Sequence, residues 1–216
     1  MVSARSFIVA CAFALTISAL PFPDAADAPC EAITAQELQE ISSATASCTE
    51  EESKTGECAD AARAAPAINR SFEKYGIQTP GEQAALIALM IFESGSFKYN
   101  KNHHPGVPGQ GTRNMQSPAY NAKYATDLFG ADVVSQAQAA GGVEAVLQLV
   151  SGDDESFGSA AWFLATQCSQ DQKTGLASGS YQGWVAYLTS CIGTTDTPER
   201  DAGWQAAKKV LNVGGQ

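Results

Sequence analysis

The sequence is poor in basic residues. Its 216 residues include 13 Lys and Arg against 23 Asp and Glu, which gives a formal net charge of −10 at pH 7. Recognition of nucleic acid depends on clustered Lys and Arg, so this class of partner is not expected. The chain also has only two histidines, which are adjacent, and its cysteines lack paired CxxC spacing. These features argue against a metal site, and no cofactor is expected.

Long apolar runs are also missing, apart from one at the N-terminus that is too short to span a bilayer. No membrane partner is therefore expected. Residues 1–19 have the pattern of a signal peptide, with Arg5 before an apolar core from Phe7 to Ile17 and the small Ala19 at the expected cleavage point. We therefore expect a secreted, extracellular protein. Residues 20–47 are interpreted as a leader or pro-segment, and residues 48–216 as one domain.

The cysteines fit an oxidising compartment. Cys11 lies in the signal peptide, which leaves five cysteines in the rest of the chain. Our predicted pairs are Cys48–Cys58, which flank a charged loop, and Cys168–Cys191, which join two late helices. Cys30 is then left over: it lies in a removed segment, pairs between molecules, or displaces Cys48 or Cys58.

Period-two alternation is weak throughout, whereas helical periodicity is strong, so the fold class is predicted to be all-α with little or no β-structure. Thr79-Pro80-Gly81-Glu82 reads as a capping box at the start of a helix that runs to about Ser94. Pro66 should break or kink the helix predicted over 59–75, which contains it. Asp153 or Asp154 can cap a later helix. Helices are predicted over 33–46, 59–75, 80–94, 117–130, 131–139, 143–150, 153–165, 182–191 and 198–213, with a solvated charge run at 49–57.

One acid stands at the end of the apolar stripe of the central helix. Leu86, Leu89, Met90 and Glu93 are spaced three or four residues apart, which places them on one side of that helix. Burial there favours the protonated form of a carboxyl group, as a general acid requires. The alternative is a Glu in the last turn that points to water. A long Gly- and Pro-containing loop without acids follows, and such loops inside compact domains tend to be functional.

Glu93-Ser94, followed about twenty residues later by Asn114-Met115-Gln116, resembles the Glu-Ser and Gly-Leu-Met-Gln motifs of goose-type lysozymes and lytic transglycosylases. The segment from Phe92 to Gln116 also resembles secreted fungal muramidase-like proteins. The resemblance implies a lysozyme-like single domain with Glu93 as the catalytic acid and Met115 and Gln116 in the cleft. The third family motif, Ala-Tyr-Asn-Ala-Gly, would correspond to Ala161–Ala165, with Trp162 in place of the tyrosine that touches the acid.

Further substrate-binding candidates come from the loop, whose amides and phenol suit sugar hydroxyl and acetamido groups: Ser94, Tyr99, Asn100, His103 and Asn114. At most one of His103 and His104 should face the cleft. Arg113 either orients substrate or braces the loop through a carboxylate. The three tryptophans are either sugar platforms or core residues. A second carboxylate would have to come from the later candidates Asp127, Asp132, Asp153, Asp154 and Glu155.

The expected function is that of a muramidase, a hydrolase that cuts the β-1,4 bond after N-acetylmuramic acid in bacterial peptidoglycan. The alternatives are chitin or chitosan hydrolysis and a secreted glycan-binding or effector protein that has lost catalysis. The partner is therefore peptidoglycan or a related amino-sugar polymer, and we expect a monomer.

Overall fold

The computed structural model describes residues 32–214, and the predicted signal peptide and Cys30 lie outside this range. Within it the fold is mainly α-helical, as the sequence predicts, with two isolated β-bridges in the loop after Glu93 and no strand. No helix in the described range has the length and apolar character needed to cross a membrane. The elements are α1 (Ala35–Ile41), η1 (Ser43–Ala46), α2 (Glu50–Lys54), α3 (Ala61–Tyr75), α4 (Pro80–Glu93), α5 (Pro118–Phe129), α6 (Ala131–Leu149), α7 (Asp153–Gln167), α8 (Gln170–Ala177), α9 (Tyr181–Ala186), the π-helix η2 (Tyr187–Ile192) and α10 (Pro198–Val210).

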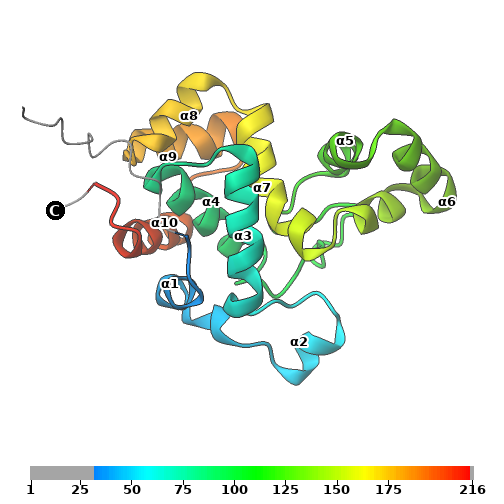
Figure 1. Ribbon diagram of the computed structural model, residues 1–216, viewed down its shortest axis with the longest axis horizontal. Helices are drawn as coiled ribbons and strands as arrows, with labels where there is room; N and C mark the ends of the chain where they lie inside the picture. Colours follow the sequence, from blue (N-terminus) through cyan, green and yellow to red (C-terminus); the bar gives the residue numbers. More distant parts are fainter. Residues whose placement is uncertain (1–31, 215–216) are drawn as a thin grey trace, which may run out of the picture.

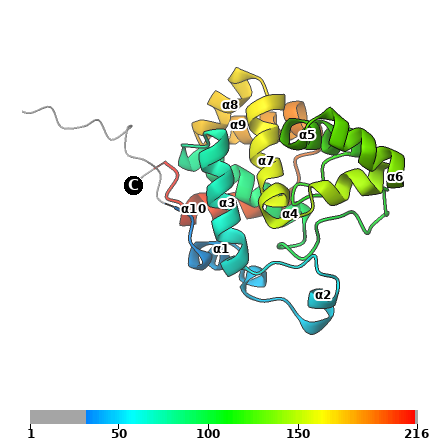
Figure 2. The ribbon, with the colours of Figure 1, turned by 45° about the vertical axis from the view of Figure 1, so that its right-hand side comes forward.

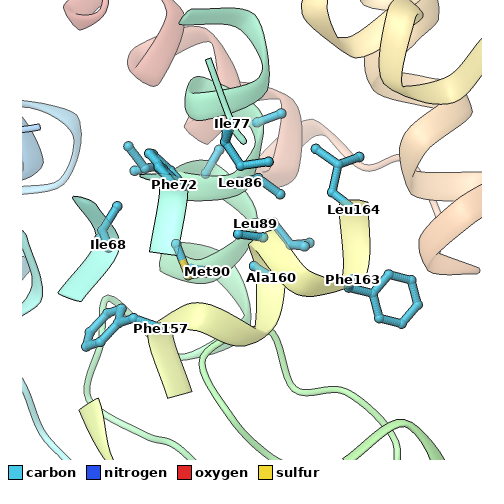
Figure 3. Close-up of a cluster of buried hydrophobic side chains, with 14 of the residues drawn as sticks. Ile68, Phe72, Ile77, Leu86, Leu89, Met90, Phe157, Ala160, Phe163 and Leu164 are labelled. Carbon is cyan, nitrogen blue, oxygen red and sulfur yellow. The ribbon is translucent and has the colours of Figure 1, made fainter. Parts of the chain in front are cut away.

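Helix α4 is the centre of the domain. It begins at the predicted capping box, in which the Thr79 hydroxyl accepts from the backbone N–H of Glu82 and the Glu82 carboxylate accepts from that of Thr79. Every residue from Gln83 to Met90 is buried, because α10, α7 and α8 all pack on this helix. Figure 3 shows Leu86, Leu89 and Met90 in the middle of the apolar cluster, between residues of α3 and α7.

Helices α3 and α7 lie side by side in the middle of the molecule, with α1 and α10 on one side and the α5–α6 pair on the other (Figures 1 and 2). Helix α3 continues through Pro66, so the predicted break is wrong. The proline lies on the exposed face, where water can bind the carbonyl that loses its N–H partner.

The C-terminal part of the predicted leader, residues 32–47, packs on the domain. Leu38 and Ile41 of α1 are buried in the core, and the Asn69 side chain of α3 exchanges two hydrogen bonds with the backbone of Ile33. Residues 32–47 therefore complete the core of the described structure. Both predicted disulfides, Cys48–Cys58 and Cys168–Cys191, are confirmed.

Three local predictions need correction. Asp153 and Asp154 do not cap α7, because α3 engages both side chains through Arg63 and Arg70. Glu57, at the end of the predicted solvated run, is buried. Helix α8 was not predicted at all; its polar sequence carries little periodicity, and Leu176 is its buried anchor.

Candidate functional site

A cavity of about 280 Å³ opens beside the C-terminal end of α4. Four of the predicted site residues line it together: Glu93, Asn114, Met115 and Gln116. The remaining lining comes from the loop, from α5 and α7, and from the segment around the start of α10. These residues are Gln110, Ser117, Tyr120, Phe163, Ile192, Gly193, Thr194 and Arg200.

The loop reaches the cavity through a strained backbone. Four non-glycine residues, Ser96, Phe97, Thr112 and Met115, have left-handed φ angles of 61°, 66°, 63° and 49°. Each such residue costs roughly 1–3 kcal/mol and persists only where its surroundings hold it. The strained positions flank both ends of the loop, and the last of them, Met115, lines the cavity.

Arg113 holds the two ends of this loop together. Its buried guanidinium donates to the carbonyls of Phe97, Tyr99 and Glu57, and it stacks on the Phe157 ring with 4.8 Å between the guanidinium carbon and the ring centroid. Burial lowers the pKa of Arg113 to about 10, although the charge of Asp153 acts in the opposite direction. Of the two predicted roles, bracing is the one the contacts support, but the acceptors are backbone carbonyls instead of a carboxylate.

The amide side chains at the cavity floor are partly committed to the protein. The Asn114 carbonyl oxygen accepts from Thr112 and Ser159, and the Gln116 amide nitrogen donates to Asn121. Among the described residues, by contrast, the Asn114 nitrogen and the Gln116 oxygen have no hydrogen-bond partner except each other, at 3.5 Å. One amide donor and one amide acceptor therefore remain available to a ligand in the cavity.

Glu93 forms an ion pair inside the cavity. Its Oε1 lies 2.6 Å from Nη2 of Arg200, a residue of the first turn of α10. The Glu93 side chain keeps 20% of its exposed surface, whereas that of Arg200 keeps 9%. Glu93 and Arg200 are the only carboxylate and the only cation that line this cavity in the described residues.

Two tyrosines belong to the surroundings of this acid, and neither is among the predicted site residues. Tyr120 lines the cavity and packs edge-on against Phe163. Tyr187 is fully buried; burial raises its pKa, and the negative charge of Glu93 raises it further. A signal for Tyr120 existed, because Ala119–Ala122 repeats the first four residues of the family's Ala-Tyr-Asn-Ala-Gly motif.

Trp162 does not lie beside Glu93. It is buried on another side of α7, donates from its indole N–H to Asp127, and contacts a separate hollow with Lys123 and Gln167. Its neighbour Phe163 lines the Glu93 cavity, and Figure 3 shows the Phe163 ring directed out of the core cluster. Adjacent residues of a helix point about 100° apart. When a motif is matched to the sequence with an error of one position, it therefore selects a side chain on another face of the helix.

The other predicted contacts lie outside the cavity. Ser94 is buried and ends α4 by donating to the Met90 carbonyl and accepting from Phe97. Asn100 is buried and donates to the Ser151 carbonyl. Tyr99 and His103 pack against each other on the surface, and His103 pairs with Glu57 at 3.0 Å. His104 is exposed.

None of the five candidate second carboxylates lines the cavity in the described structure. Asp127 accepts from Trp162, while Asp153 and Asp154 pair with Arg63 and Arg70. Asp132 is exposed, and Glu155 lies in the first turn of α7. The site therefore offers one carboxylate, and any chemistry there has to use it alone or with a group of the substrate.

Comparison with known proteins gives a partial relative. The chain is 40% identical over 162 residues to a Fusarium oxysporum (strain Fo5176) protein named bifunctional dioxygenase (DOX)-epoxy alcohol synthase (EAS). The match covers 70% of this chain and 12% of that protein. No protein-family model and no solved structure matches the chain.

Proposed function

We propose that this protein is a secreted muramidase that hydrolyses the β-1,4 bond after N-acetylmuramic acid in bacterial peptidoglycan. One observation carries the proposal: the cavity brings Glu93 together with Asn114, Met115 and Gln116, the residues on which the resemblance to goose-type lysozymes rests. The two disulfides support secretion. The activities in the relative's name are not part of the proposal, because most of that protein lies outside the matching segment.

In the proposed reaction, Glu93 donates a proton to the glycosidic oxygen as the bond to the sugar carbon breaks. The Asn114 nitrogen and the Gln116 oxygen hold an acetamido group, since this group needs one donor and one acceptor. A two-carboxylate mechanism would need a second acid about 5–9.5 Å away. Because Glu93 is the one acid that the described residues place in the cavity, the sugar carbon is attacked by water or by an oxygen of the substrate itself.

The test is mass spectrometry of soluble fragments released from purified peptidoglycan. Glu93→Gln keeps the shape of the side chain and removes the proton, so it should abolish fragment release. Glu73→Gln, at an exposed position of α3, is the matched control and should leave release unchanged. Circular dichroism and a thermal melt of each variant separate loss of chemistry from loss of fold.

Fragments with reducing ends from wild type and Glu73→Gln, but not from Glu93→Gln, would support a hydrolase. Anhydro ends would identify a lytic transglycosylase, in which a substrate hydroxyl replaces water. Undiminished release by Glu93→Gln would refute the role of this acid.

The Glu93–Arg200 ion pair favours a second candidate, a secreted glycan-binding protein without catalysis. A carboxylate that is held by a guanidinium serves as an ion-pair partner, and its oxygen faces the cation instead of a glycosidic oxygen. Under this alternative the cavity binds amino sugars but cleaves nothing. Sedimentation of the wild-type protein with insoluble peptidoglycan, without release of any soluble fragment, would support the binding function over the enzyme.

A further inference from the structure

Arg200 is held in the cavity with part of its binding capacity unused. It is nine-tenths buried, and its guanidinium carbon lies 4.1 Å from the centroid of the Phe92 ring. Nη2 contacts Glu93 and also donates to the Thr194 hydroxyl at 3.3 Å. Nη1 is buried and has no hydrogen-bond partner in the described residues. A buried donor without an acceptor is costly, so an arriving acceptor would gain from binding there.

A guanidinium with one free terminal nitrogen is suited to a planar, two-oxygen anion. Carboxylates bind arginine through two parallel N–H···O bonds, which need both Nη1 and Nη2 or Nη2 and Nε. Glu93 approaches Nη2, whereas Nη1 has no hydrogen-bond partner in the described residues, so Glu93 does not occupy the fork formed by Nη1 and Nη2. Because Arg200 is the one cation that the described part of the chain places in the cavity, a carboxylate on the ligand would compete directly with Glu93 for it.

We propose that Arg200 recognises a carboxylate of the glycan substrate and that this carboxylate displaces Glu93 from the guanidinium. The displaced Glu93 is then no longer an ion-pair partner, and it can take a proton from water and deliver it to the glycosidic oxygen. Anionic glycans therefore activate the site, whereas neutral chitin fragments leave the Glu93–Arg200 pair closed. This inference rests on the proposed glycan substrate and adds its substrate class: acidic amino-sugar polymers.

Two sources of carboxylate are possible in peptidoglycan. Glycan strands without stem peptides carry a free lactyl carboxylate on each N-acetylmuramic acid, whereas intact peptidoglycan carries carboxylates on the stem peptides. Chitooligosaccharides carry neither. Rates on these three substrates therefore distinguish the two sources from each other and from a neutral sugar.

The first experiment compares kcat/KM of wild type, Arg200→Gln and Arg200→Lys on the three substrates. Arg200→Gln should lower kcat/KM on the acidic substrate about tenfold to a hundredfold, the range of a charge-assisted pair, and should not lower it on chitooligosaccharides. Arg200→Lys keeps the positive charge but not the two-pronged geometry of the guanidinium. Its kcat/KM on the acidic substrate should therefore lie between those of wild type and Arg200→Gln. If kcat/KM falls only on glycan strands without stem peptides, the lactyl carboxylate is the ligand of Arg200. If kcat/KM falls on intact peptidoglycan, the ligand is a carboxylate of the stem peptide. Equal losses on all three substrates would refute the inference.

A second experiment needs no catalysis. Calorimetry or NMR titration with N-acetylmuramic acid, and with N-acetylglucosamine as the neutral control, measures the competition directly. Glu93→Gln should bind N-acetylmuramic acid more tightly than wild type, because the competing carboxylate is gone, while Arg200→Gln should bind it at least tenfold more weakly. Neither change should alter the affinity for N-acetylglucosamine. If Glu93→Gln weakened the binding of N-acetylmuramic acid, the displacement would be wrong.

The two proposals can fail separately. If wild type releases no fragment from any substrate, the muramidase proposal fails. The opposite effects of Glu93→Gln and Arg200→Gln on carboxylate binding would still support the competition at Arg200. If wild type releases fragments but Arg200→Gln lowers kcat/KM equally on acidic and neutral substrates, the muramidase proposal is supported and the displacement of Glu93 is refuted.

Discussion

Replacing Arg113 should loosen the loop that forms one wall of the Glu93 cavity. The guanidinium donates to three backbone carbonyls, those of Phe97, Tyr99 and Glu57, and these lie on segments far apart in the chain. Hydrogen bonds from a charged donor contribute about 1.5–3 kcal/mol each. Arg113→Met removes the guanidinium that stacks on Phe157 and leaves the carbonyls of Tyr99 and Glu57 without a donor. The Phe97 carbonyl still accepts from the backbone N–H of Ala59.

The expected loss can be bounded from these contacts. Leaving a buried acceptor unpaired costs about 1–3 kcal/mol, so the two orphaned carbonyls give roughly 2–6 kcal/mol. Arg113→Lys retains the charge but cannot span three acceptors, and we expect it to lose about 2–3 kcal/mol. Against a typical domain stability of about 5–15 kcal/mol, either change is large.

Urea unfolding measures the free energy, and hydrogen exchange locates the effect. Exchange should accelerate at the amides of residues 97–116, where the strained positions depend on Arg113, before it accelerates in α4. Arg70→Met is the matched control, because Arg70 is half exposed and pairs with Asp154 at the surface. It should cost no more than about 1 kcal/mol. An Arg113→Met protein as stable as the Arg70→Met protein, with unchanged exchange in the loop, would refute the bracing role.

Two further predictions concern the segment that leads from α9 into α10. Replacing Cys168 and Cys191 together by Ser should lower the free energy of unfolding by about 3 kcal/mol, because the bridge closes a loop of 23 residues; a loss below 1 kcal/mol in urea unfolding would contradict this. Asp196 and Asp201 share the Tyr181 hydroxyl, and burial together with Asp196 raises the pKa of Asp201. Because the folded-state pKa of Asp201 is raised, its contribution to stability is full at low pH and is lost as the pH rises through that pKa. Asp196→Asn should therefore raise Tm at pH 7 and have little effect at pH 3. Thermal melts at both pH values test this, and a lower Tm at pH 7 would show that the two carboxylates do not repel.

The features that the sequence predicts correctly are those set by short stretches of chain. The Thr79 capping box needs four consecutive residues, and it marks the start of α4 to the residue. The two disulfides follow from spacing, since 10 and 23 residues suit the connection of neighbouring elements. Gly130 and the Gly141-Gly142 pair likewise mark the end of α5 and the kink inside α6.

In a fully buried helix it is harder to predict which residues face the core and which face a cavity. Every residue from Ser156 to Leu164 in α7 is buried, so hydrophobic periodicity does not distinguish the face that meets the core from the face that meets the cavity. The motif comparison therefore selected Trp162, although Phe163 is the residue that lines the cavity. The same limit applies to Glu57, whose burial depends on a loop more than forty residues away.

The partner of Glu93 could not be predicted from local pattern at all. Arg200 is more than a hundred residues later, in the first turn of a helix whose sequence reads as an exposed amphipathic segment. Its position depends on the packing of α10 against α4, which carries the guanidinium to the end of the helix that holds the acid. A motif centred on Glu93 identifies the acid but contains no information on what holds its charge. The chemistry of this site therefore depends on two helices together, and a chain with the same motif but without a cation at the start of α10 should not require an acidic substrate.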